Sequence, residues 1–137
     1  DTSKGLGIIN TFLEKIIGDH SITIYGNGEN IRNYIYVTDV ARLLSLSVNS
    51  NVNSNIFNLA SDDNISINQL VGIIKEIVKE EFKINYKETR QSDNPAISLD
   101  NTKIKNAYTD FKFVALTEGI EQTYTHIKKK GVKNKQN

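Results

Sequence analysis

The 137-residue chain contains no cysteine, no methionine and no tryptophan, and it has a single proline. Without cysteine there can be no disulfide framework and no thiolate metal site, and two scattered histidines argue against a histidine-based metal site. No apolar run approaches the ~18 residues of a membrane span, and the N-terminus does not resemble a signal peptide. We therefore expect a cytoplasmic protein that has no membrane partner and binds no metal.

An excess of charge of either sign is also missing, because 17 basic and 16 acidic residues leave a net charge of +1. Such a balance provides no basic field of the kind that nucleic-acid binding usually requires, so we expect no nucleic-acid partner. The one charge run, residues 128–135, is interpreted as a solvated C-terminus. Because methionine is absent, we expect the sequence to be a fragment of a longer protein.

Helical and strand patterns alternate along the chain. Apolar residues at helical spacing, with suitable caps and stops such as Gly18 and Ser66, predict helices at residues 5–17, 40–48, 66–82, 98–108 and 116–129. Thr117 is expected to cap the last of these, with Glu118 in its first turn. Alternating or continuous apolar runs predict strands or extended segments at residues 22–25, 34–37, 56–60 and 83–88. The predicted class is mixed α/β or α+β, with small strand pairs and helices in a single unit over residues 1–137.

Residues 38–60 stand apart from this pattern. Thr38 and Asp39 are a plausible N-cap for a helix that is apolar on most sides. Residues 56–60 read as a strand buried within a parallel sheet, although no parallel neighbour is evident in the chain. This region is therefore expected to complete a larger sheet that lies outside the sequence.

Arginine is scarce, since three of the seventeen basic residues are arginines. Two of them, Arg32 and Arg90, stand beside turns rather than in the lysine-rich segments. A guanidinium matches the forked oxygens of a pyrophosphate with two parallel hydrogen bonds, whereas lysine offers a point charge. The residues alone leave two interpretations open, a phosphate contact or a surface salt bridge.

Five segments, in order, resemble the C-terminal, substrate-binding part of the NAD-dependent epimerase/dehydratase family. These are extended short-chain dehydrogenase/reductases that act on nucleotide sugars, and the resemblance is closest to UDP-glucose 4-epimerase-like members. The segments are "GLGIINTFLEKI", "ITIYGNGENIRNYIYVTDVA", "FNLASDDNISINQLVGII", "YKETRQSDNPAISLDNTKIKNAY" and "ALTEGIEQTYTHIKK". The resemblance implies that residues 38–60 would complete the Rossmann domain of a longer, homodimeric NAD enzyme.

The resemblance also implies a UDP-sugar site. In it Arg32 and Arg90 hold the diphosphate, Asp93 accepts hydrogen bonds from the ribose, Thr23, Tyr25 and Ile8 lie along the uracil, and Tyr34 flanks the sugar or diphosphate. Asp93 before Asn-Pro is also a typical turn former, and ordinary packing explains the aromatic and apolar residues equally well. Asn33 stands where the family usually has Asp, whose charge is expected to orient Arg32 or the end of the strand. This and other differences from the family pattern leave the identity of the sugar open.

The groups that perform the family's chemistry are missing from the sequence. There is no Gly-rich dinucleotide fingerprint, and the pairs Tyr108–Lys112 and Tyr124–Lys128 have the Tyr-x-x-x-Lys spacing by accident. We therefore expect that NAD binds outside these residues and that the isolated chain has no epimerase activity. Two alternatives are a dTDP- or UDP-sugar 4,6-dehydratase or decarboxylase of the same family, and a non-catalytic module that self-associates through an exposed apolar surface.

Overall fold

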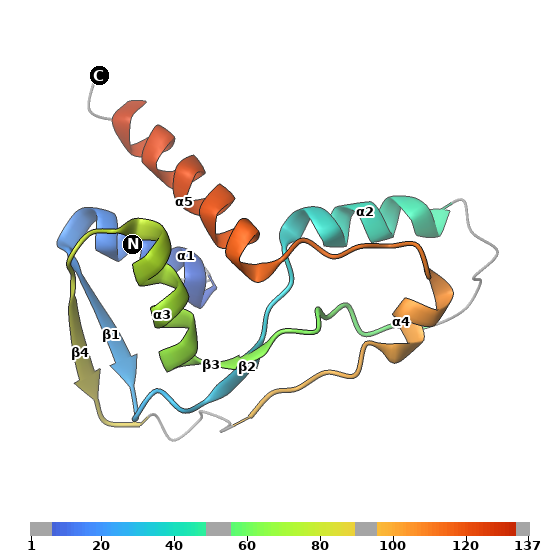
Figure 1. Cartoon of the computed structure of the whole chain (residues 1–137), viewed down its shortest axis with the longest axis horizontal. Coiled ribbons are helices and arrows are strands. Elements are labelled where there is room, and N and C mark those ends of the chain that lie inside the picture. The colour runs from blue at the N-terminus through green and yellow to red at the C-terminus, as the bar shows by residue number, and fades with distance from the viewer. Residues whose placement is uncertain (1–6, 49–55, 90–95, 134–137) are drawn as a thin grey trace.

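A computed structural model describes residues 7–48, 56–89 and 96–133, and it is a mixed α/β structure, as predicted (Figure 1). The elements follow in the order α1 (Ile8–Asp19), β1 (Ser21–Tyr25), β2 (Ile31–Asn33), α2 (Val37–Val48), β3 (Asn64–Ser66), α3 (Ile67–Val78), β4 (Lys83–Lys87), α4 (Thr102–Ala107) and α5 (Leu116–Lys133).

The strands form two small pairs. β1 and β4 are parallel, from Ser21 opposite Lys83 to Tyr25 opposite Lys87. β2 and β3 are antiparallel, and Asn33 lies opposite Asn64. The expected small strand pairs are thus present, and each of them joins segments that are far apart in the sequence.

The hydrophobic core lies between β1 and three helices, α1, α3 and α5. The apolar positions of each helix recur every three or four residues, so each helix turns one stripe inward. The buried members of the core are Phe12, Leu13, Ile16, Ile22, Ile24, Ile67, Leu70, Val71, Ile74, Val78, Ile120 and Tyr124. Ser66 caps α3, as predicted, and Gln69 completes a capping box. The Ser66 hydroxyl accepts from the Gln69 amide at 3.1 Å, and the Gln69 side chain accepts from the Ser66 amide at 2.8 Å.

α2 and α4 lie at the opposite end of the molecule from β1 and β4 (Figure 1). Asp39 joins this end to the segment that leads into α5. Its carboxylate is fully buried and accepts hydrogen bonds from the Arg42 guanidinium at 3.0 Å and from the Val114 backbone amide at 2.8 Å. Arg42 also donates to the Lys112 carbonyl at 3.3 Å and lies over the Phe111 ring, 4.4 Å from its centroid.

The predicted capping role of Thr38 and Asp39 is wrong. α2 begins at Val37, and the amides of Asp39 and Val40 donate to the carbonyl of Tyr36, at 3.0 and 3.4 Å. The Asp39 side chain caps no amide of its own helix; it pairs with Arg42 one turn further along α2 and accepts from the Val114 amide, which needs an acceptor at this place. Thr117 is likewise no cap, since α5 begins one residue before it, whereas Glu118 lies in the first turn as predicted.

Two predicted strands also differ from the structure. The strand near Arg32 comprises residues 31–33, and residues 34–36 form no strand. Residues 56–60 form no strand either, and Ile56 is 88% exposed. An apolar run pairs only where a neighbouring edge is available, and the described part of the chain places none beside it.

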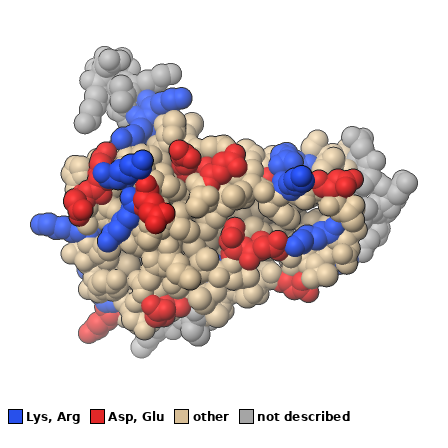
Figure 2. All heavy atoms as spheres, viewed as in Figure 1, with Lys and Arg blue, Asp and Glu red and all other residues tan. Residues whose placement is uncertain are grey.

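Acidic and basic side chains are interspersed on the face shown in Figure 2. Charged side chains also pair across elements, as in Lys105 with Asp62 at 2.9 Å and Lys128 with Glu80 at 3.2 Å. Of the helices that the structure describes, none has the length and apolar character needed to cross a membrane. The described residues also contain no cluster of His, Asp or Glu that could hold a metal ion. The cytoplasmic location stays a prediction.

Replacing Asp39 by Ala is expected to lower the free energy of unfolding by about 3 kcal/mol, because the Val114 amide loses its buried acceptor and Arg42 loses its partner. Urea denaturation followed by circular dichroism measures the change. Asp110→Ala is the matched control, since Asp110 is exposed, and it should change stability by less than about 0.5 kcal/mol. Equal effects of the two substitutions would contradict the role assigned to Asp39.

Candidate functional site

A cavity of about 470 Å³ opens where α1, β1 and residues 30–34 meet. We call it the Arg32 pocket. Five of the seven residues predicted to bind a nucleotide sugar line it: Ile8, Thr23, Tyr25, Arg32 and Tyr34. The other two, Arg90 and Asp93, lie outside the described residues. The structure therefore brings together residues that the sequence separates by up to 26 positions.

The turn between β1 and β2 carries Arg32 to this pocket. Gly26 and Gly28 both adopt positive φ, 78° and 79°, in which a side chain would be strained. A Cβ at Gly28 would also overlap the side-chain amide of Asn68, at the start of α3. The Asn68 side chain donates to the Asn27 carbonyl at 3.0 Å and to the Glu29 carboxylate at 2.6 Å. These hydrogen bonds hold the turn against α3 and so fix the direction in which β2 continues from it.

Arg32 is the one charged side chain among the described residues that line the pocket. Its guanidinium donates to the carbonyl of Ile31 at 2.8 Å. Polar groups of Thr23, Asn30 and Asn33 and apolar side chains of α1 and α3 complete the lining. Such a cavity, apolar in part and with one fixed positive charge, suits an anionic ligand that also has a ring to bury.

Tyr34 presents an unusual polar group. Its hydroxyl is buried and has no hydrogen-bond partner among the described residues. Burial raises the pKa of Tyr34 to about 12, while the nearby positive charge of Arg32 acts in the opposite direction. The hydroxyl is therefore neutral at ordinary pH and can donate a hydrogen bond. Buried polar groups in native proteins nearly always have a partner, so this one marks a place where a ligand group can bind.

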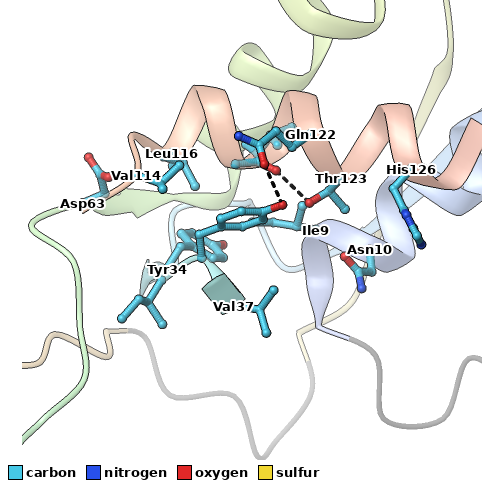
Figure 3. A pocket seen from close by; sticks show the side chains of 14 residues that line it. Ile9, Asn10, Tyr34, Val37, Asp63, Val114, Leu116, Gln122, Thr123 and His126 are labelled. Carbon is cyan, nitrogen blue, oxygen red and sulfur yellow. Dashed lines mark hydrogen bonds between the residues drawn. The ribbon is translucent and has the colours of Figure 1, made fainter. Parts of the chain in front are cut away.

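A second cavity, of about 610 Å³, shares Tyr34 with the first and lies between α1, residues 34–37 and α5 (Figure 3). In Figure 3 Thr123 and His126 extend from α5 on the side of Asn10. Across the cavity the Tyr36 hydroxyl donates to the Gln122 side chain at 3.1 Å. Sequence reasoning did not find this cavity, although residues 119, 122, 123 and 126 have the spacing of one helix face.

Residues 2–60 match the model of the family described as "NAD dependent epimerase/dehydratase family". The chain is 29% identical over 125 residues to dTDP-4-dehydro-6-deoxyglucose reductase of Escherichia coli, an alignment that covers 89% of this chain and 39% of that protein. It is 30% identical over 122 residues to UDP-glucuronic acid decarboxylase 1 of Xenopus tropicalis, which covers 89% of this chain and 29% of the relative.

Among solved structures, the chain is similar to UDP-glucose 4-epimerase of Thermotoga maritima with UDP-glucose. The TM-score is 0.84 at 29% identity, and the match covers 95% of this chain and 42% of that one. The chain thus spans less than half the length of the relatives it matches. The resemblance that the motifs predicted is confirmed, and the three relatives carry three different reactions.

Gly28→Ala is expected to lower the free energy of unfolding by about 1–3 kcal/mol, because it combines a positive φ with an overlap against Asn68. The matched control is Gly72→Ala in α3, where a Cβ meets nothing within 4 Å. There the substitution should raise stability by about 0.5–1 kcal/mol, because alanine favours the helix. Thermal unfolding distinguishes the two, and a neutral Gly28→Ala would show that the turn is not seated as described.

Proposed function

We propose that this chain, which is related to the NAD-dependent epimerase/dehydratase family, supplies the nucleotide-sugar site of a UDP-hexose 4-epimerase. The observation that carries the proposal is the gathering of Ile8, Thr23, Tyr25, Arg32 and Tyr34 around one cavity with a single positive charge among its described lining. The likeness to an epimerase structure that contains UDP-glucose supports the choice of ligand.

In this proposal Arg32 donates paired hydrogen bonds to the diphosphate. Thr23 and Tyr25 on β1 hold the uracil together with Ile8 on α1. Backbone groups there can pair with the base, and an aromatic ring can cover it. The buried hydroxyl of Tyr34 donates to the diphosphate or to the sugar. Arg90 is proposed as a second diphosphate ligand and Asp93 as the acceptor for the ribose hydroxyls.

The chemical step is assigned to groups outside these 137 residues, because the sequence contains no dinucleotide fingerprint and no suitable Tyr-x-x-x-Lys pair. NAD, when bound there, supplies reversible hydride transfer at the sugar. The described residues contribute binding energy at the nucleotide, which is remote from the reacting carbon. Such remote binding orients the sugar and is part of the catalytic advantage.

The exposed face of α2 is proposed as the contact with the dinucleotide-binding domain. Val37, Leu44 and Val48 are 70%, 57% and 81% exposed, and with Ala41 they recur every three or four residues along the helix. A stripe of this kind is a typical interface rather than a free surface. Residues 38–60 would thus complete the Rossmann domain of a homodimeric enzyme, and the isolated chain would self-associate through the uncovered stripe.

A second candidate is a dTDP- or UDP-sugar 4,6-dehydratase or decarboxylase of the same family. The relative named UDP-glucuronic acid decarboxylase 1, at 30% identity, favours it. Tyr34 and Val40 stand where dehydratases usually have Trp and His, and this favours the epimerase. A third candidate, a non-catalytic binding or self-associating module, uses the same pocket and the same α2 face without the chemical step.

The proposed role of Arg32 predicts that Arg32→Gln weakens binding of UDP about tenfold or more and leaves binding of uridine nearly unchanged. Isothermal titration calorimetry with the 137-residue chain measures both affinities. Lys15→Gln is the control, because it removes an exposed positive charge whose pairing with Asp19 lies on the surface and it does not line the pocket. Equal affinities of the Arg32 variant and the unchanged chain for UDP would refute the diphosphate role.

The proposed interface predicts that Leu44→Lys with Val48→Lys reduces self-association of the chain and preserves its affinity for UDP. The reason is that two charges on the apolar stripe oppose burial of that stripe in an interface. Sedimentation velocity measures the association state. The control, Asn106→Lys with Thr109→Lys, adds the same charge at exposed positions near α4. If both double variants sediment alike, the stripe is not the contact.

A further inference from the structure

The turn between β1 and β2 contains the one Asn-Gly dipeptide of the sequence, Asn27–Gly28. Asparagine is a thermolabile residue, and a following glycine makes it more so, because no Cβ obstructs the approach of the next backbone nitrogen. Asn27 is exposed, and its side-chain oxygen accepts from the Glu29 amide at 3.1 Å, a hydrogen bond within the turn itself. Water and base therefore reach the side-chain amide of Asn27.

The reaction open to this dipeptide is deamidation. A solvent base removes the proton of the Gly28 amide, and the nitrogen attacks the side-chain carbonyl carbon of Asn27. The new C–N bond closes a five-membered imide, while the side-chain nitrogen takes up a proton and leaves as ammonia. Water then opens the imide at one of its two carbonyls. One product is aspartate, and the other is isoaspartate, in which the main chain runs through the side-chain methylene and is one atom longer.

The folded turn opposes the closure of this ring. The ring closes only when the Gly28 nitrogen eclipses the Cβ of Asn27, a ψ outside the main allowed regions, so the peptide unit between the two residues must rotate. That unit is planar and also carries the Asn27 carbonyl, which accepts from the Asn68 side chain at 3.0 Å. Closing the ring therefore breaks this hydrogen bond.

Asn68 holds the same turn at further points. Its backbone amide donates to the Gly28 carbonyl at 3.0 Å, and its side chain donates to the Glu29 carboxylate at 2.6 Å. Gly28 is buried, and a Cβ there would overlap the Asn68 side chain, so the two residues are in direct contact. The dipeptide is thus free to rotate only when the turn leaves α3, which is a local opening and costs less free energy than global unfolding.

We propose that Asn27–Gly28 is a site of spontaneous deamidation and that the contacts of Asn68 gate it. The side-chain amide is preserved while the turn lies against α3, and the imide forms when the turn detaches. In the isoaspartyl product the former main-chain carbonyl of Asn27 belongs to a side-chain carboxylate, and the main chain to Gly28 is longer. Asn68 then no longer fits both acceptors, so the modification releases the turn from which β2 continues. The inference requires no ligand and is independent of the proposed function.

The test follows aspartate and isoaspartate at position 27 by peptide mapping and mass spectrometry, with the 137-residue chain in mildly alkaline buffer. We expect the folded chain to deamidate about tenfold or more slowly than the same chain in guanidinium chloride, because the folded turn is mostly closed. Asn68→Ala removes the side-chain donor and should raise the rate in the folded chain about fivefold. Asn106→Ala is the matched control, since Asn106 is exposed on α4, and it should leave the rate unchanged.

Asn68→Asp provides a second variant and carries the test if the alanine variant does not fold. It keeps the size of the side chain, loses both N–H donors and repels the Glu29 carboxylate, so the rate should rise at least as much. Equal rates in the folded and denatured chains, or no increase in either Asn68 variant, would overturn the gate. Failure of either product to form at position 27 of the denatured chain would overturn the site.

Hydrogen exchange at the Asn68 amide, which donates to Gly28, measures the effect of the modification on the turn. Exchange should be faster in the purified isoaspartyl form, because the longer linkage moves the acceptor. It should be unchanged in Asn27→Asp, which has the normal linkage and keeps a side-chain oxygen for the Glu29 amide. If the isoaspartyl form exchanges like the unchanged chain, the modification does not release the turn.

Discussion

The buried carboxylate of Asp39 joins α2 to the segment that leads into α5. One oxygen accepts from Arg42 within α2, and the other accepts from the Val114 amide just before α5. Since α5 contributes Ile120 and Tyr124 to the main core, Asp39 connects the distal α2–α4 end to that core through the start of α5. Burying a carboxylate costs free energy unless its oxygens are paired, so few other placements of Asp39 would be stable. The walls of the larger cavity, which include Val114 and Leu116, depend on the same contact.

The Arg32 pocket depends on a comparable long-range support. Asn68 at the start of α3 holds the turn that precedes β2, and Asn33 at its end holds the turn after residue 60. Between these two contacts the strand is three residues long, which is too short to be stable by its own pairing. The position of Arg32 is therefore set by side-chain amides that bind backbone carbonyls on both sides. A single fixed guanidinium in a partly apolar cavity is the physical basis of the proposed nucleotide-sugar site.

The exposed stripe of α2 has a different physical origin. The opposite face of the helix buries Asp39 and Leu43, so the helix has already used one side for packing. The remaining apolar side chains form a second face, and its exposure to water is unfavourable. In a chain that spans less than half of its relatives' length, such a face fits the proposal that another domain covers it.

Local patterns in the sequence determined a good part of this protein. Helical spacing approximately placed the five helices of the described residues, and Ser66 was correctly identified as the cap of α3. These features depend on residues within one or two turns of each other.

The tertiary structure decided which partners the polar side chains at helix starts and strand ends bind. Asp39 binds the Val114 amide instead of capping its own helix, and Asn33 binds the Ser61 carbonyl. It also decided that residues 56–60 form no strand and that β1 pairs with β4. Each of these outcomes depends on an acceptor or an edge supplied by a segment distant in sequence, which no local pattern records.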